Sequence, residues 1–301
     1  MSDCSYSSEE RKLLKNCCIC PRRCHVDRFS GELGECKTGV NPKVASYNLH
    51  YGEEPPISGT QGSGTIFFSY CNLHCIYCQN YPISQMGIGE VVSLPRLVEM
   101  MLELQTRGAH NINFVTPTHV TVQVRRAIIC AKEQGLNIPI IYNSSGYDSV
   151  EQLRLVDGLV DIYLVDMRYD NNQVARRYSD VEDYGEINKQ ALKEMYRQTG
   201  VLQLDKKGIA KKGMIIRHLI LPGGLSGTDG IFRFISEELS PQTYISLMSQ
   251  YFPAWKALED DKINRRITVE EYQEAVELLD KYGLERGWMQ SFVGLKGGIG
   301  V

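Results

Sequence analysis

The feature that most constrains this chain is the placement of its cysteines. Nine of its ten cysteines lie before residue 80, and seven of these form two closely spaced groups. The groups are Cys17-x2-Cys20-x3-Cys24 with Cys36 downstream, and Cys71-x3-Cys75-x2-Cys78. A disulfide framework needs an oxidising compartment, and the polar N-terminus with Glu9 and Glu10 is unlike a secretory signal. We therefore expect a cytoplasmic protein whose clustered thiols bind metal.

The overall composition is that of an ordinary globular protein. The 301 residues are 43% hydrophobic and 23% charged, and 33 Lys and Arg against 36 Asp and Glu leave a net charge of −3. So small a charge predicts no nucleic-acid partner. No apolar run approaches the ~20 residues that cross a bilayer, so we also expect no membrane span.

Short apolar runs alternate with helical patterns from residue 64 to about 250. The six strand candidates are 65–70, 111–115, 138–142, 159–165, 213–221 and 243–248. Near-continuous apolar strands separated by helices are typical of a parallel sheet covered by helices. Six such units are two short of a closed eight-fold barrel. The predicted fold class is therefore α/β, as a partial (β/α)6 TIM-like barrel with a small N-terminal cysteine-rich lobe.

Capping residues and turns divide the chain further. Ser93 is expected to cap the helix after the first strand, and capping boxes are expected at Ser149-x-x-Gln152 and Thr268-x-x-Glu271. A proline pair followed by the glycine-rich residues 59–64 marks a boundary. We predict a metal-binding lobe over 1–57, a barrel over 58–255 and a C-terminal helical extension over 256–301.

The second cysteine group falls directly after the first predicted strand, at the edge where such barrels carry their chemistry. A closed zinc site needs four ligands, whereas this group supplies three cysteines, with His74 as a possible fourth ligand. Three thiolates on a cubic iron–sulfur cluster leave one iron open to a small molecule. A zinc site or three buried thiols is the alternative.

The run Cys71-Asn72-Leu73-His74-Cys75-Ile76-Tyr77-Cys78-Gln79-Asn80 resembles the signature of the radical S-adenosylmethionine (SAM) superfamily. Residues 53–59 (EEPPISG), 111–119, 142–147 (YNSSGY) and 247–251 (LMSQY) resemble one branch of it. This is the branch related to pyruvate formate-lyase activating enzyme, in particular its members with an added cysteine-rich N-terminus. The resemblance runs from about residue 17 to about residue 255.

The resemblance implies that Cys71, Cys75 and Cys78 hold a [4Fe-4S] cluster whose open iron binds SAM. Reductive cleavage of SAM would then give a 5′-deoxyadenosyl radical that abstracts hydrogen. The implied target is a protein residue, such as the glycine of a glycyl-radical enzyme, and the implied electron donor is a flavodoxin or ferredoxin. A small-molecule substrate, or a non-enzymatic iron–sulfur or zinc protein, remains open. No catalytic residue is identified.

The resemblance also suggests residues that hold SAM, each with a simpler alternative. Tyr77 is expected to contact the adenine, or else only to pack. The superfamily usually has a Gly-Gly-Glu loop after the second strand, where this chain has residues 116–119 (TPTH). Thr118 is therefore the candidate contact to the methionine amino group, unless it caps the helix that begins near Val120.

Polar residues at the ends of three later strands complete this set. Ser144 and Ser145 suit the ribose or the carboxylate of SAM, or ordinary turn chemistry. Asp166 and Arg168 stand where activating enzymes carry Asp-x-Lys, and an ion pair inside the barrel is the alternative. Arg217 matches an arginine for the methionine carboxylate, with an internal carboxylate as its other possible partner.

The N-terminal set of Cys17, Cys20, Cys24 and Cys36 suits either a structural zinc or a second iron–sulfur cluster. Cys18 is a possible substitute for Cys17, and unligated thiols are the third possibility.

Overall fold

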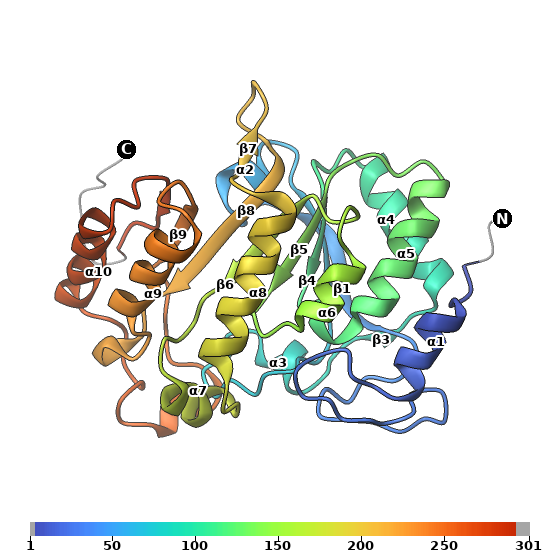
Figure 1. Ribbon diagram of the computed structural model, residues 1–301, viewed down its shortest axis with the longest axis horizontal. Coiled ribbons are helices and arrows are strands. Elements are labelled where there is room, and N and C mark those ends of the chain that lie inside the picture. Colours follow the sequence, from blue (N-terminus) through green and yellow to red (C-terminus); the bar gives the residue numbers. More distant parts are fainter. Residues whose placement is uncertain (1–3, 293–301) are drawn as a thin grey trace.

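The centre of the molecule is a parallel sheet, and all six predicted strands belong to it (Figure 1). The computed structural model describes residues 4–292. The parallel strands are β2 (Ser63–Phe68), β4 (Ile112–Val115), β5 (Ile140–Ser144), β6 (Ile162–Asp166), β8 (Ala210–Leu219) and β9 (Tyr244–Met248). They are neighbours in this order, so each connection returns the chain to the next position in the sheet. The prediction of a mixed α/β fold with a parallel sheet is confirmed.

Short strands extend the sheet at both edges. On one side, β1 (Lys43–His50) pairs antiparallel with β2 and with β3 (Glu90–Val91). On the other side, β10 (Gly287–Met289) pairs parallel with β9, while β7 (Gln203–Leu204) forms a hairpin with β8. Strand β1 lies within the predicted cysteine-rich lobe and β10 within the predicted helical extension. The sheet therefore extends past both of the boundaries expected from the sequence.

Helices connect the strands, and α4, α5, α6 and α8 cover one face of the sheet (Figure 1). The α-helices are α1 (Ser8–Lys15), α2 (Pro55–Ser58), α3 (Tyr81–Ser84), α4 (Leu94–Thr106), α5 (Thr121–Glu133), α6 (Val150–Leu155), α7 (Asn172–Ser179), α8 (Tyr184–Thr199), α9 (Thr228–Phe234) and α10 (Val269–Lys281). Further helical turns within residues 4–292 are η1 (Thr118–Val120), η2 (Pro222–Gly224), η3 (Ile235–Leu239) and η4 (Trp255–Glu259). No helix within residues 4–292 is long and apolar enough to cross a membrane.

Two of the three predicted helix caps are present. Ser93 accepts a hydrogen bond from the amide of Arg96, and Thr268 and Glu271 form a complete capping box. The capping box predicted at Ser149 is wrong. Ser149 does occupy the N-cap of α6, but its hydroxyl donates to Glu151 instead of accepting from the helix backbone.

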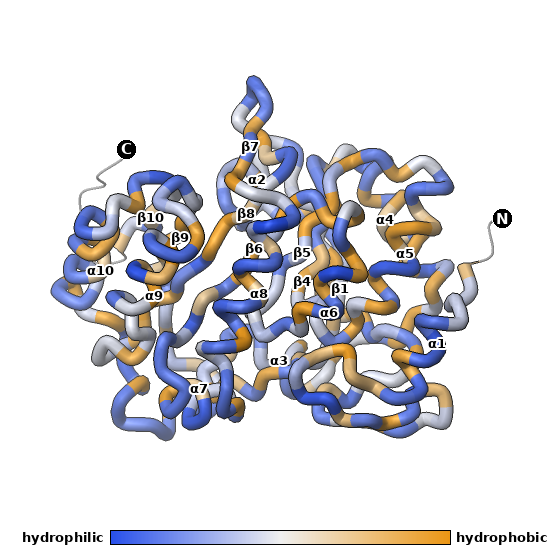
Figure 2. Tube along the Cα trace, in the orientation of Figure 1, coloured by the Kyte–Doolittle hydropathy of each residue, from blue (hydrophilic) through white to orange (hydrophobic). Residues whose placement is uncertain are grey.

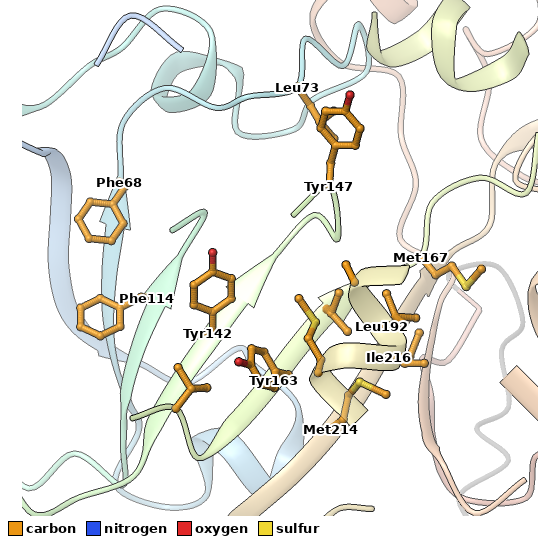
Figure 3. Packing of buried hydrophobic residues seen from close by; sticks show 14 of the residues in the cluster. Phe68, Leu73, Phe114, Tyr142, Tyr147, Tyr163, Met167, Leu192, Met214 and Ile216 are labelled. Carbon is orange, nitrogen blue, oxygen red and sulfur yellow. The ribbon is translucent and has the colours of Figure 1, made fainter. Parts of the chain in front are cut away.

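The two faces of the sheet differ in chemistry because side chains alternate along each strand. The helix-covered face carries a row of buried aromatic rings, in which Phe68 stacks on Phe114 and Tyr142 meets Tyr163 edge-on (Figure 3). The helices place apolar stripes on these rings, while hydrophilic segments gather at the surface (Figure 2). The row fixes the strands and therefore the positions of the loops that follow them.

The opposite face is apolar at one end and polar at the other. Ile141, Ile162 and Ile215 form a buried cluster that Ile57 of α2 closes at the amino ends of the strands. Towards the carboxyl ends the same face carries polar residues, among them Asp166 and, in partner strands, Asn143 and Arg217. The candidate site is built on these polar ends.

The segment before β1 contains one helix and long loops, which lie beside α5 (Figure 1). Glu10 of α1 accepts hydrogen bonds from Arg125 at 2.5 Å and from Arg126 at 2.7 and 2.9 Å. Leu14 packs in a small cluster with Val122. These contacts tie the first cysteine group to the rest of the molecule.

Candidate functional site

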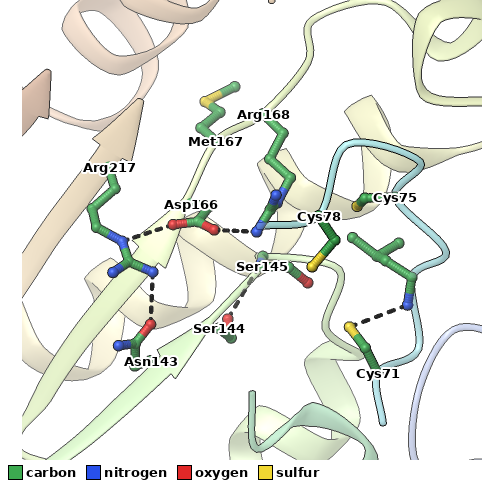
Figure 4. Close-up of polar contacts among 12 residues, drawn as sticks. Cys71, Cys75, Cys78, Asn143, Ser144, Ser145, Asp166, Met167, Arg168 and Arg217 are labelled. Carbon is green, nitrogen blue, oxygen red and sulfur yellow. Dashed lines mark hydrogen bonds and ion pairs between the residues drawn. The ribbon is translucent and has the colours of Figure 1, made fainter. Parts of the chain in front are cut away.

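The second cysteine group forms a loop at the carboxyl end of β2. Tyr70 adopts a left-handed backbone conformation, with φ of 68°, and this turns the chain out of the strand into the loop. Cys75 is buried, while Cys71 and Cys78 are partly covered. All three sulfurs come from within eight residues and face the ends of β5 and β6 (Figure 4).

Each of the three sulfurs has a hydrogen-bonding neighbour. The Cys71 sulfur accepts from the amide of Leu73 at 3.4 Å, and the Cys75 and Cys78 sulfurs lie 2.9 and 3.1 Å from the hydroxyls of Ser179 and Ser84. Burial raises the pKa of the Cys71 thiol to about 12, and the neighbouring Cys75 raises it as well. Metal binding is the ordinary way to hold such buried sulfurs as thiolates.

His74 does not join the three sulfurs. Its Nε2 lies 3.3 Å from a carboxylate oxygen of Glu35, and its Nδ1 lies 3.4 Å from the amide oxygen of Gln85. Both ring nitrogens are therefore engaged elsewhere, and the loop offers three ligands rather than four.

A buried ion-pair network faces the loop. Asp166 accepts from Arg168 at 2.5 Å with one oxygen and from Arg217 Nε at 2.7 Å with the other (Figure 4). Arg217 also donates to the side-chain oxygen of Asn143 at 2.7 Å. The alternation that places Asp166 and Arg168 on one side is thus present. The internal carboxylate partner that the sequence left open for Arg217 is Asp166.

Glu53 joins this network and was not identified as a site residue from the sequence. Its carboxylate lies 3.6 Å from Arg217 and accepts a 3.2 Å hydrogen bond from Asn113. Burial raises the pKa of Glu53 to about 7, and Arg217 limits the rise. Glu53 belongs to one of the phrases that carry the resemblance, but it lies in the loop after β1, so no strand pattern predicts that it reaches the barrel interior.

Arg168 Nε and the Ser145 hydroxyl lie beside the thiol loop (Figure 4), and both are among the buried polar atoms that have no hydrogen-bond partner in residues 4–292. Buried polar atoms normally find partners, so an orphaned pair needs an explanation. Three buried thiols, a guanidinium with a free donor and a free hydroxyl suit an iron–sulfur cluster with an anionic or polar ligand. The residues present therefore fit the cofactors that the resemblance implies.

Ser144 and Thr118 lie beside a different carboxylate, that of Asp148, although the Thr118 hydroxyl itself has no hydrogen-bond partner within residues 4–292. The Ser144 hydroxyl donates to Asp148 at 2.6 Å, and the hydroxyls of Tyr142 and Thr118 lie beside the same carboxylate. Thr118 does not cap the following helix, whose N-cap is Val120 with no side-chain hydrogen bond. That alternative for Thr118 is wrong, and Asp148 is a second buried carboxylate that the sequence patterns did not indicate.

Tyr77 belongs to the loop itself, and its side chain is buried. Its hydroxyl lies 2.5 Å from that of Tyr169, and its ring meets the rings of Tyr169 and Tyr251 edge-on. The packing role that the sequence left open for Tyr77 is present, and contact with adenine stays a prediction.

The structure brings the first cysteine group together as well. Cys17, Cys20 and Cys36 are buried and Cys24 is partly covered. Burial raises the pKa of the Cys20 thiol to about 12, and the nearby sulfurs of Cys36, Cys17 and Cys24 contribute to the rise. The sulfur of Cys18 lies 3.4 Å from a ring nitrogen of His25.

Arg28 is buried within this first group. Its guanidinium donates to the Cys36 sulfur at 3.6 Å and to the backbone oxygen of His119 at 2.9 Å. Burial alone would lower the pKa of Arg28, but the charge of Cys36 and Cys17 raises it. Within the described part of the chain, no three His, Cys, Asp or Glu side chains surround a point suited to one metal ion.

Comparison with known proteins defines the family of this chain. It is 34% identical over 284 residues to the uncharacterized protein MJ0674 of Methanocaldococcus jannaschii, a match that covers 91% of this chain and 77% of that protein. The chain therefore belongs to the same family as MJ0674. The uncharacterized protein MJ0808 of the same organism is 24% identical over 285 residues, covering 85% of this chain and 78% of that protein. No family model matches the sequence.

Solved structures share the fold at low sequence identity. The [FeFe]-hydrogenase maturase HydG matches with a TM-score of 0.50 and 12% identity over 75% of this chain, and HydG from Carboxydothermus hydrogenoformans with 0.52 and 13% over 75%. Methylornithine synthase (PylB) matches with 0.50 and 14% over 77%. The matches span 50% and 52% of the two HydG chains and 66% of PylB. At identities this low, the structural matches show a common fold and nothing more.

Proposed function

We propose that this chain is a radical SAM enzyme of the branch related to pyruvate formate-lyase activating enzyme. The observation that carries the proposal is the loop of three cysteines after β2, which faces a buried network of charges at the ends of β6 and β8. Three thiolates would hold a [4Fe-4S] cluster with one iron free. The fold is compatible with this proposal, since it is shared with two enzymes, the [FeFe]-hydrogenase maturase HydG and methylornithine synthase.

The residues around the loop would bind and orient SAM. Arg168 and Arg217 share the carboxylate of Asp166, and Arg217 also lies 3.6 Å from Glu53. Their combined positive charge therefore exceeds the negative charge of this network whenever Glu53 is protonated. This excess suits the methionine carboxylate. The free hydroxyl of Ser145 suits a second polar contact, while Tyr77 is proposed to contact the adenine and Thr118 or Ser144 to complete the pocket.

The cluster, when bound, supplies the electron that cleaves SAM reductively. The chain itself would hold the nucleotide away from water. The hydroxyls of the buried Tyr77 and Tyr169 contact each other under the loop, and the Cys75 sulfur contacts the Ser179 hydroxyl. A flavodoxin or ferredoxin is proposed as the donor of that electron in the cytoplasm. The proposed substrate is a residue of another protein, such as the glycine of a glycyl-radical enzyme, with a small molecule as the second candidate.

The test is anaerobic reconstitution with iron and sulfide, followed by SAM and dithionite. The wild-type protein should form 5′-deoxyadenosine, whereas Cys75→Ala should not. Cys130→Ala is the matched control, because Cys130 is equally buried but lies in α5. A protein that binds iron without cleaving SAM would instead be an iron–sulfur protein with no enzymatic role, and the proposal would be wrong.

A further inference from the structure

Arg28 is a buried cation without a carboxylate partner. It is 2% exposed, and none of the ion pairs formed by residues 4–292 includes it. Its Nε atom has no hydrogen-bond partner there either. A buried guanidinium normally requires an anion, because removing an unpaired charge from water costs several kcal/mol in ordinary proteins. Within residues 4–292, the counter-charge of Arg28 is therefore not supplied by a carboxylate.

The groups that surround Arg28 are thiols. Its Nη2 donates to the Cys36 sulfur at 3.6 Å, and the Cys17 and Cys20 sulfurs lie close to the guanidinium. The amide of Glu35 donates to the Cys24 sulfur at 3.5 Å. Hydrogen bonds from N–H groups to sulfur are typical of thiolates bound to metal, whose charge they offset.

We propose that Cys17, Cys20, Cys24 and Cys36 form a metal–thiolate centre whose negative charge is balanced by Arg28. Four thiolates around Zn²⁺, or around a [4Fe-4S] core of the same charge, leave two units of negative charge. Either centre would supply the anion that Arg28 lacks. The described sulfurs do not surround one point suited to a single ion, so the arrangement favours the cluster, and zinc would require the sulfurs to move closer together. The shared chemistry is a thiolate-bound metal of net negative charge, and the two metals are distinguished by experiment.

The same centre is joined to the start of the barrel cysteine loop by two contacts. Arg22, between Cys20 and Cys24, donates through Nε to the backbone oxygen of Asn72 at 3.0 Å. Arg28 Nη1 donates to the backbone oxygen of His119, whose ring Nε2 lies 3.0 Å from the backbone oxygen of Ser69. Ser69 and Asn72 flank Cys71. An ordered N-terminal centre therefore fixes the position of the loop that is proposed to bind SAM, and this second role rests on the proposed function.

The first experiment isolates the N-terminal centre. In the triple variant Cys71→Ala/Cys75→Ala/Cys78→Ala, purified without oxygen, the proposal expects about one zinc or about four iron atoms per chain by elemental analysis. Adding Cys20→Ala and Cys36→Ala should remove this metal, and adding Cys18→Ala should not. A triple variant that holds neither metal would overturn the proposal. Because SAM cleavage by the wild type is measured separately, its failure alone would refute only the radical SAM assignment.

The second experiment tests Arg28 as the balancing charge. In the same triple variant, Arg28→Met should weaken metal retention against a chelator at least ~10-fold, and Arg28→Lys should restore part of it. Arg23→Met is the matched control, since Arg23 is exposed on the same loop. Equal retention by Arg28→Met and Arg23→Met would contradict the role of Arg28.

A third measurement does not depend on how well the variants fold. In the wild-type protein, alkylation followed by mass spectrometry should find Cys18 reactive and Cys24 protected, although both are partly covered. Chelator should expose Cys24 and leave the reactivity of Cys18 unchanged. Equal reactivity of these two thiols before chelation would contradict the metal centre.

The link to the barrel loop has its own readout. With the barrel cysteines intact, Cys20→Ala/Cys36→Ala should lose iron from the barrel site several-fold faster under chelator than Cys18→Ala does. Equal rates would show that the N-terminal centre does not position the barrel loop.

Discussion

The two thiol groups of this protein use the same side chains in different electrostatic settings. In the barrel loop, three thiols lie beside Arg168, whose charge Asp166 already balances. In the N-terminal group, the thiols of Cys36, Cys17 and Cys20 lie near Arg28, which has no carboxylate partner within residues 4–292. The first arrangement leaves a ligand position and two orphaned polar atoms for a further molecule. The second is complete once a metal is bound. Under the two proposals, one more thiol and the absence of a carboxylate partner would distinguish a closed structural centre from an open, reactive one.

The largest expected effect is that of removing one barrel thiol. Cys75→Ala should lower the rate of SAM cleavage by more than ~100-fold, because a cluster with two protein ligands is not retained. Iron bound at the barrel should fall with it, while the N-terminal metal should stay. The amount of 5′-deoxyadenosine formed measures SAM cleavage, and elemental analysis measures the bound metal. Cys18→Ala, the control in the other region, should change neither, and substantial cleavage by Cys75→Ala would remove the distinction between the two groups.

The next effect concerns the charge that balances the barrel arginines. Asp166→Ala leaves two buried guanidinium groups without their shared carboxylate and should lower the free energy of unfolding by about 3–5 kcal/mol. Urea unfolding of the apoprotein measures this. Asp229→Ala removes a surface pair with Lys281 and should have a much smaller effect. Similar losses in the two variants would mean that the barrel network is no more critical than a surface pair.

Glu53 gives the barrel a characteristic pH dependence. Burial raises its pKa to about 7, so the folded protein keeps this proton over a pH range in which the unfolded chain loses it. Stability should therefore fall as the pH rises from about 4.5 to about 7, by up to about 3 kcal/mol. Glu53→Gln should not show this fall, whereas the exposed control Glu99→Gln should follow the wild type. Parallel urea-unfolding profiles for wild type and Glu53→Gln would rule out this role.

Glu10 should give the N-terminal region the opposite dependence. Burial alone would raise its pKa, but hydrogen bonds from the Ser7 amide and from Arg126 lower it overall. The stabilisation that Glu10 gives the folded protein is thus present above the ordinary pKa of a glutamate. This stabilisation is lost as the pH falls below that pKa. At pH 7, Glu10→Gln should cost about 1–2 kcal/mol, and the difference should vanish in acid. The exposed neighbour Glu9→Gln should unfold like the wild type, and a Glu10→Gln deficit that persisted in acid would contradict the assignment.

The fold was largely predictable because its signals are local. Each parallel strand is an apolar run, and caps such as Ser93 and Thr268 act within one helical turn. The short strands β3 and β10 have too few residues to carry a pattern, and β1 is mostly half-buried with no clear alternation. Ser149 had the sequence of a capping box, but its hydroxyl found Glu151 instead.

The site was predictable only where sequence neighbours act together. The cysteine spacing and the Asp166–Arg168 alternation placed those residues on the same loop or strand face. Glu53 and Arg28 were missed as site residues because each meets its partners through long-range contacts. Asp148, whose partners Ser144 and Tyr142 are close in sequence, was missed because it follows the strand in a turn. No pattern in the sequence indicates which buried charge will lack a carboxylate.

The open position at the barrel cluster is the central claim, and electron paramagnetic resonance tests it most directly. The reduced spectrum should be recorded in the Cys20→Ala/Cys36→Ala variant, which removes any signal from the N-terminal group, before and after SAM is added. A shift in the g values on adding SAM is predicted, because the nucleotide would bind the iron that no cysteine holds. An unchanged spectrum at saturating SAM would contradict the account.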